Sequence, residues 1–253
     1  MDINVVREYL TGEKFDRGLI TPYKRKMYPA KNRRYYLEPI CRNKKIIHVG
    51  FVAHSEVVDR RIETGDWVHA QLMDWSTRCL GLDIDQKGVD YLKDIHGITD
   101  AVCSDITGGI IPEIANENWD YAFLGDVLEH VPNPVMFLEG FKKYNNINRL
   151  IISVPNLFRR DLFDNAFEYF ERVNSDHLYG FTAYNLCKTI TSAGYYPEDM
   201  VYCEPIGKLP AYQKWKRSLY KRIGMDLNLP YFYFKTQMVI VKNANQVFDD
   251  MKF

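Results

Sequence analysis

The sequence has few cysteines, and none of them forms a recognisable pair. Its five cysteines are scattered over 253 residues, and no two are spaced as C-x-x-C. An odd, scattered set argues against a disulfide framework, and the missing C-x-x-C pairs argue against a zinc site. We therefore expect free thiols in a reducing, cytoplasmic environment.

Long hydrophobic runs and an excess of one charge are also missing. No apolar run approaches the length of about 20 residues that a membrane-spanning helix needs, and the first residues lack the basic and apolar regions of a signal peptide. The 33 basic residues balance 33 acidic ones, so the overall charge indicates neither nucleic acid nor an anionic membrane as a partner. We expect no membrane partner and no nucleic-acid partner.

What is present is an alternation of short apolar runs with longer amphipathic ones between residues 45 and 241. Such alternation is typical of βα units on a mostly parallel sheet. A hydrophobic fraction of 46% in a chain of this length suffices for one sizeable core. Strands are predicted at residues 45–49, 80–83, 101–104, 119–124, 149–154, 199–203 and 231–241.

Helix-end patterns are clearest in the second half of the chain. Thr182 can cap a helix that stops before Gly194. Another helix is predicted to begin near Asn133, because Pro134 then occupies a first-turn position that tolerates proline. A third helical pattern, upstream, contains His69, which either points into a site or packs in the interior.

Two regions lie outside this core pattern. Residues 1–44 carry a basic and aromatic run between Tyr23 and Tyr36, which either forms a lid, binds an anionic substrate group or is a solvated surface. A second region, at about 207–229, is predicted to be a helical insertion that covers the core, serves substrate choice or contacts a second copy in a homodimer. We therefore divide the chain into an N-terminal extension and a main domain, residues 45–253.

A short strand followed by an acidic turn marks the candidate active site. From Trp119 to Pro134 the sequence runs from apolar residues into Gly-Asp-Val-Leu-Glu-His and then opens a helix. Ligands of open α/β sheets collect outside the carboxyl ends of the strands. We therefore expect four residues at the rim of the site, namely Gly125, Asp126, Glu129 and His130.

This stretch resembles the segment after the fourth strand of the class I S-adenosylmethionine (SAM)-dependent methyltransferases, where an acidic residue precedes V-L-E-H-V. Gly-Leu-Asp83-Ile-Asp is similar to the second-strand motif of that family, Ser-Asp105-Ile to the third-strand motif, and Asp-His177-Leu-Tyr-Gly-Phe to the loop after the fifth strand. The resemblance spans about residues 44 to 242. It implies an α/β fold with a Rossmann-like seven-stranded, mostly parallel sheet in the order 3-2-1-4-5-7-6, helices on both faces, and SAM as the cofactor.

The first loop departs from the family pattern. The family has D-x-G-x-G-x-G there, whereas this sequence keeps only Gly50 of those glycines. The missing second glycine argues against NAD and FAD, because a pyrophosphate needs close approach of the backbone. SAM has no phosphate, so one glycine followed by small residues can suffice. His54 replaces a glycine, and it either contacts the methionyl tail or packs at a helix start.

The resemblance also assigns the rest of the cofactor site. Asp83 would accept hydrogen bonds from the ribose hydroxyls, while Asp85 is better suited to cap the following helix. Asp105 would accept the exocyclic amine of adenine, with Ile106 covering the ring. The alternative is that Asp105 is a turn residue. Further expected cofactor contacts are Ile84, Gly125 and Asp126.

Methyl transfer to a hydroxyl needs an aligned acceptor and a base for its proton. His130 and His177 are the candidate bases, and Glu129 or Asp176 could orient the imidazoles. An alternative is that Asp126, Glu129 and His130 hold Mg²⁺ at the helix start. A further interpretation is that these groups only satisfy the backbone of the turn, and we expect no metal.

The expected function is O-methylation of a small molecule, with a sugar or nucleotide-linked acceptor or a phosphate-containing glycan precursor as the substrate. The turn after the fourth strand lacks the [DNS]-P-P-[YFW] motif used for exocyclic amines, which disfavours a nucleic-acid methyltransferase. The competing hypothesis is an inactive methyltransferase-fold scaffold or binding module, because the first loop has lost its glycines.

Overall fold

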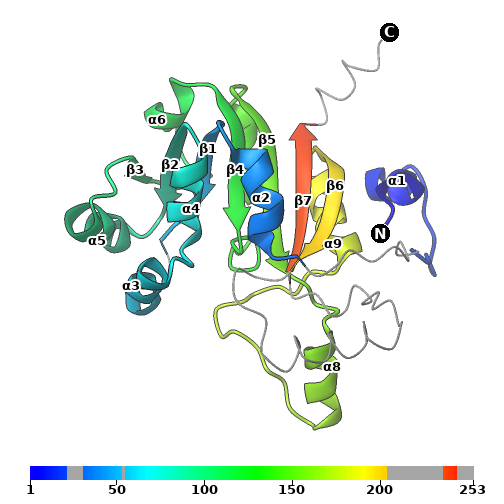
Figure 1. Cartoon of the computed structure of the whole chain (residues 1–253). Coiled ribbons are helices and arrows are strands. Elements are labelled where there is room, and N and C mark those ends of the chain that lie inside the picture. The colour runs from blue at the N-terminus through cyan, green and yellow to red at the C-terminus, as the bar shows by residue number, and fades with distance from the viewer. Residues whose placement is uncertain (22–30, 53–54, 204–235, 244–253) are drawn as a thin grey trace, which may run out of the picture.

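The computed structural model describes residues 1–21, 31–52, 55–203 and 236–243, and the described part contains one mixed sheet (Figure 1). Its strands are β1 (Lys45–Val49), β2 (Arg78–Asp83), β3 (Ala101–Cys103), β4 (Trp119–Gly125), β5 (Ile147–Pro155), β6 (Tyr195–Cys203) and β7 (Thr236–Asn243). The strand order is β3-β2-β1-β4-β5-β7-β6. The first five strands are parallel, whereas β7 runs antiparallel to both β5 and β6. The predicted fold class and strand order are confirmed.

The observed strands depart from the predicted ones mainly at β6. This strand begins at Tyr195 rather than at residue 199. Pro197 disguises its first part, because proline lacks the N–H that a ladder uses. The sheet accommodates Pro197 because β6 is an edge strand and the register shifts between Pro197 and Asp199. Residues 231–235 of the predicted last strand and the predicted insertion at 207–229 lie outside the described residues.

Helix ends follow the capping patterns of the sequence. Thr182 accepts from the Asn185 backbone N–H in a capping box, and Gly194 follows the same helix with a φ of 75°. Asn133 caps the helix that Pro134 opens. The helices are α1 (Ile3–Thr11), α2 (Arg33–Cys41), α3 (Ser55–Thr64), α4 (Val68–Trp75), α5 (Gln86–His96), α6 (Pro112–Ala115), α7 (Pro134–Glu139), α8 (Arg160–Phe167) and α9 (Ala183–Ser192), with a 3₁₀ turn at Gly140–Lys143.

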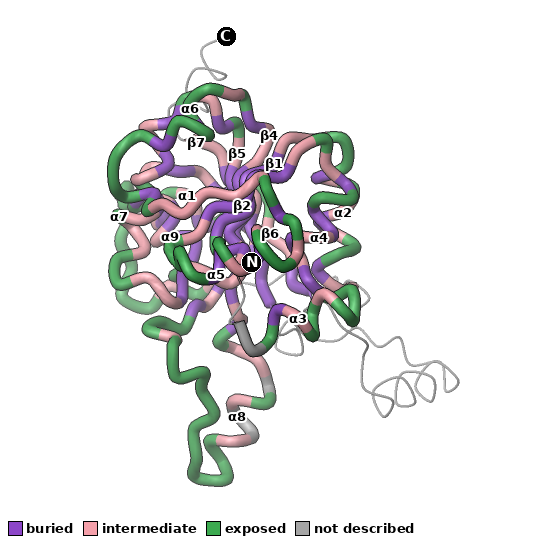
Figure 2. Tube along the Cα trace, turned by 90° about the vertical axis from the view of Figure 1, so that its left-hand side faces the viewer, coloured by how far each residue is buried: buried purple, intermediate pink, exposed green. Residues whose placement is uncertain are grey.

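The central strands are buried on both faces by helices. Leu124 of β4 belongs to a cluster with Leu138 of α7 and Leu186 of α9. Its neighbour Phe123 points the other way, into a cluster with Leu37 of α2. This alternation explains the apolar run at residues 121–124 of β4, since the part of a strand that is covered on both faces needs apolar side chains at successive positions. Figure 2 shows the buried positions gathered along the strands.

The described N-terminal helices pack against the sheet and its covering helices. Cys41 of α2 is fully buried in the same cluster as Phe123. Val6 and Leu10 of α1 pack with Cys187 of α9, and the Lys188 ammonium donates to the Leu10 carbonyl at 2.7 Å. In Figure 1, α1 lies beside β6, and α8 lies beyond the carboxyl end of β4 at the bottom of the view. Within the described ranges, no helix combines the length and apolarity needed to cross a bilayer.

Candidate active site

A buried arginine fixes the turn at the end of β4. Asp126 adopts the left-handed backbone region, with φ 59°, which aspartate tolerates better than most residues. Its Oδ2 accepts from Arg33 Nη1 at 2.7 Å, and the same Nη1 donates to Ser153 Oγ at 2.9 Å. Burial disfavours the charge on Arg33, but the Asp126 carboxylate outweighs it and raises the Arg33 pKa. The start of α2 is thereby joined to the ends of β4 and β5.

The burial of Arg33 disagrees with the interpretation of the N-terminal basic run as a lid or a solvated surface. Arg33 is only 7% exposed and is held in an ion pair with Asp126. Residues 22–30, which contain much of the basic run, lie outside the described residues.

Glu129 is a buried carboxylate. Its exposed fraction is 0%, and neither Oε1 nor Oε2 has a hydrogen-bond partner among the residues the structure describes. Burial, followed by the nearby Asp126 carboxylate, raises the pKa of Glu129 to about 8. Buried carboxylates are normally hydrogen-bonded or paired, so this group is incomplete as it stands.

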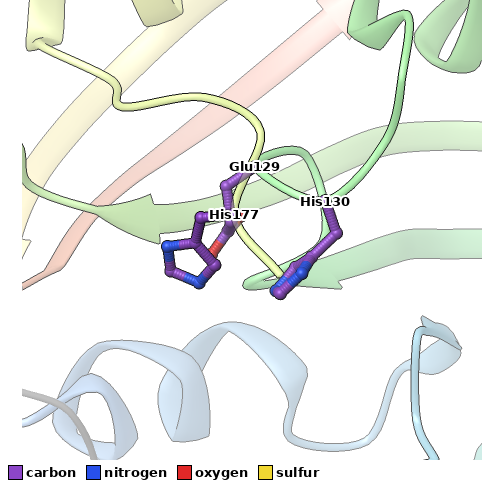
Figure 3. A group of neighbouring side chains, drawn as sticks. All are labelled: Glu129, His130 and His177. Carbon is purple, nitrogen blue, oxygen red and sulfur yellow. The ribbon is translucent and has the colours of Figure 1, made fainter. Parts of the chain in front are cut away.

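Two histidines lie beside this carboxylate (Figure 3). The rings of His130 and His177 meet edge to face, with centroids 4.7 Å apart. One side-chain nitrogen of each histidine and one oxygen of Glu129 all lie within 4.8 Å of one another. Burial, and then the neighbouring His130, lower the pKa of His177. The structure thus brings together the three predicted catalytic residues, which we call the Glu–His–His cluster.

Backbone contacts hold the loop after β5 against this cluster. The Leu178 N–H donates to the Glu129 carbonyl at 2.8 Å, which fixes the position of the preceding His177. On the other side, His130 Nδ1 lies 3.1 Å from the Asp176 carbonyl oxygen. The orienting contact predicted between Asp176 and an imidazole is thus made to His130 by the Asp176 backbone carbonyl. These contacts link residues about fifty positions apart in the sequence.

In the first loop, position 50 requires glycine because of its backbone angle and because of a close neighbouring side chain. Its φ is 70°, and a Cβ at this position would lie 2.6 Å from Val127 Cγ2. The first loop therefore passes directly against the turn that leads to Glu129. His54 lies outside the described residues, so its two interpretations stay open. At the end of β4, a Cβ on Gly125 would lie 2.7 Å from the Phe123 ring.

Asp83 ties the first loop to the end of β2. Its Oδ2 accepts from the Val52 N–H at 2.9 Å, and its Oδ1 accepts from Ile84 and Asp85 N–H groups at 2.8 and 3.1 Å. Burial raises the pKa of Asp83, while these backbone bonds oppose the rise. The carboxylate has about four lone-pair sites and these bonds use three, so one hydroxyl donor can still be accepted. Asp85 occupies the N-cap of α5 but makes no side-chain capping bond.

Asp105 and Ile84 form the outer part of this edge. Asp105 is exposed, and its Oδ1 accepts from both the backbone N–H and the hydroxyl of Thr107 at 2.8 Å, as a turn residue does. Ile106 packs into the core with only 2% exposed, whereas Ile84 is 76% exposed. We call Asp83, Ile84 and Asp105 the β2–β3 edge.

His69 is an interior residue. It is fully buried, with Nδ1 3.1 Å from His48 Nδ1, and it packs against Phe51 and Trp67. Burial lowers the pKa of His69 to about 3, so the ring is neutral.

Comparison with known proteins gives structural matches only. No protein-family model and no curated protein sequence matches the chain. A SAM-dependent methyltransferase from Mesorhizobium loti is similar at 12% identity, covering 83% of this chain and 97% of that one, with a TM-score of 0.50. The small RNA methyltransferase HEN1 is similar at 16% identity, covering 89% of this chain but 27% of that one, with a TM-score of 0.53.

The protein has the class I SAM-dependent methyltransferase fold. In this methyltransferase fold, the β2–β3 edge and the Glu–His–His cluster lie at the same end of the sheet, on opposite sides of β1. Sequence reasoning found both sets of residues. It missed Arg33 as the partner of Asp126, because an arginine within a basic surface pattern gives no indication that it will be buried.

Proposed function

We propose that this protein transfers the methyl group of SAM to a hydroxyl of a small molecule or a sugar- or phosphate-containing acceptor. The observation that carries the proposal is the Glu–His–His cluster, which lies at the carboxyl end of β4 next to the first loop. In the reaction the acceptor oxygen attacks the methyl carbon, the carbon–sulfur bond breaks, and S-adenosylhomocysteine leaves. The hydroxyl proton must pass to a nearby base, which the cluster supplies.

SAM would lie along the β2–β3 edge and the first loop. Asp83 would accept a ribose hydroxyl through Oδ2, exposed Ile84 would cover one face of the adenine, and Asp105 would accept the adenine amine through its remaining oxygen. The close contact of Gly50 with Val127 would bring the methionyl end near Glu129. The methyl group would then face the cluster, as an in-line transfer requires.

An O-methyl acceptor suits this cluster better than an exocyclic amine. A hydroxyl must lose its proton to become a good nucleophile, and a buried carboxylate with two imidazoles is an arrangement suited to proton removal. Because Arg33 is paired with Asp126, this arginine is not available to hold an acceptor phosphate. Recognition of a phosphate or sugar would fall to other residues.

Calorimetric titration with SAM and S-adenosylhomocysteine tests the proposal first. We expect micromolar binding of both, and then methyl transfer in a screen of hydroxylated metabolites and sugar nucleotides. RNA oligonucleotides with free terminal hydroxyls belong in the same screen, since methylation of RNA alone would replace the small-molecule acceptor. Failure to bind either cofactor form would favour the inactive scaffold.

A further inference from the structure

We propose that Glu129, His130 and His177 bind one divalent transition-metal ion, which holds the acceptor hydroxyl. The role of the ion in catalysis rests on the proposed function, whereas the binding site stands on the geometry of the three side chains. The alternative Mg²⁺ site considered from the sequence used Asp126 in place of His177. The structure groups the residues differently, because Arg33 engages Asp126.

The first argument is the state of Glu129. Both of its carboxylate oxygens are buried and lack a hydrogen-bond partner among the described residues. A buried carboxylate is stable only when it is neutralised or paired. Arg33 is a nearby cation, but its bonds go to Asp126 and Ser153. A metal ion would supply the missing positive charge at the carboxylate itself.

The second argument is distance. Two atoms that bind one ion at about 2.1 Å each can be no more than about 4.2 Å apart. The three candidate atoms lie within 4.8 Å of one another, so a small rotation of the side chains completes the site. In Figure 3 the three side chains reach into the same space.

The third argument is the support behind each ligand. His130 Nδ1 lies 3.1 Å from the Asp176 carbonyl oxygen, so Nδ1 carries the proton and Nε2 presents its lone pair. A carbonyl behind the outer nitrogen is the usual support of a metal-binding imidazole. The Glu129 carbonyl meanwhile accepts from the Leu178 N–H, which keeps His177 beside the carboxylate.

The donor set selects the class of ion. Two imidazole nitrogens and one carboxylate suit Mn²⁺, Fe²⁺, Co²⁺ or Zn²⁺, whereas Mg²⁺ and Ca²⁺ prefer oxygen ligands. Three protein ligands leave positions open for other oxygens. A hydroxyl bound there would lose its proton more easily and would be fixed in direction. The ion would therefore act as a Lewis acid without change of oxidation state.

The test measures binding of Co²⁺ and Mn²⁺ to the full chain after treatment with EDTA and its removal. We expect one ion per chain with micromolar affinity, and d–d absorption of bound Co²⁺ in the visible range. Glu129→Gln and His177→Asn should each weaken binding at least about tenfold. His96→Asn is the matched control, because His96 pairs with Asp59 away from the cluster, and its binding should equal the wild type.

Two results would overturn the metal proposal. One is the absence of Co²⁺ and Mn²⁺ binding to the folded wild-type protein, and the other is unchanged binding in both ligand variants. Circular dichroism establishes that each variant is folded, and Glu129→Gln preserves the side-chain shape. SAM affinity is measured separately in EDTA, so SAM binding without metal binding leaves the proposed function intact and removes only the metal site.

Discussion

The β2–β3 edge and the Glu–His–His cluster lie at the same end of one sheet, but their carboxylates are in opposite states. Asp83 accepts three backbone N–H groups, and Asp105 accepts two donors from Thr107. Glu129 accepts none from the described residues through its side chain. The carboxylates of the β2–β3 edge thus have hydrogen-bond donors within the protein. The Glu129 carboxylate would gain a partner when a ligand binds at the cluster.

This difference separates the expected effects of mutation. Substitutions at the β2–β3 edge should weaken both the fold and the cofactor affinity, since in the proposed function the same carboxylates would serve both. Substitutions in the cluster should stop the chemistry while leaving the fold intact, because the Glu129 carboxylate makes no hydrogen bond to the described residues. Such a division is common where function requires an arrangement that stability does not favour.

The largest effect is expected for Glu129→Gln. Turnover with the acceptor found in the screen should fall by about 10²- to 10⁴-fold, because the carboxylate that receives the proton or holds the ion is lost. The SAM dissociation constant should stay within about twofold. Single-turnover methyl transfer and calorimetry measure the two quantities. Glu139→Gln, an exposed glutamate of α7, is the control, and equal turnover in both variants would remove Glu129 from the mechanism.

The second largest effect is expected for Arg33→Met, which removes the arginine that joins α2 to the ends of β4 and β5. This variant loses the bonds to Asp126 and Ser153, so the free energy of unfolding should fall by about 3 kcal/mol. Urea denaturation measures the change. Arg34→Met is the matched control on the same helix, since Arg34 is half exposed, pairs with Glu38 and lies 5.4 Å from the Trp75 ring centroid, and it should change stability by about 1 kcal/mol or less. Similar losses in the two variants would contradict a structural role for the Arg33 pair.

The β2–β3 edge is tested with Asp83→Ala. Removing the carboxylate leaves the Val52, Ile84 and Asp85 N–H groups without their acceptor, which should cost about 2 kcal/mol of unfolding free energy. SAM affinity should fall at least about tenfold as the ribose acceptor is lost. Asp85→Ala is the neighbouring control, because its side chain makes no capping bond. Unchanged SAM affinity in Asp83→Ala would exclude a ribose role for this residue.

The smallest effect is expected where the first loop meets the turn before Glu129. Gly50→Ala introduces both a left-handed alanine and an overlap with Val127 Cγ2. Gly12→Ala introduces the left-handed strain alone, since nothing lies within 4 Å of a Cβ there. We expect Gly50→Ala to lose about 1 kcal/mol more than Gly12→Ala in thermal or urea unfolding. Equal losses would mean that Val127 moves aside without cost.

Local sequence patterns predicted most of the sheet and several helix ends. β1 has its predicted bounds, and the helix between Thr182 and Gly194 has the predicted cap and stop. These features depend on neighbouring residues, whose types are visible in the sequence. The predicted start of β6 was wrong, because Pro197 breaks the local strand pattern. The edge position of β6 permits a proline there.

The sequence by itself determined the βα alternation, the strand order through its resemblance to a known fold, and the residue types at the ends of the strands. Only the tertiary structure decided which of those residues meet. Arg33 and Asp126 are 93 positions apart, and His177 reaches Glu129 through a long loop after β5. Burial and charge compensation are properties of the assembled fold, so no local pattern could show that Asp126 has a partner and that the Glu129 carboxylate has none among the described residues.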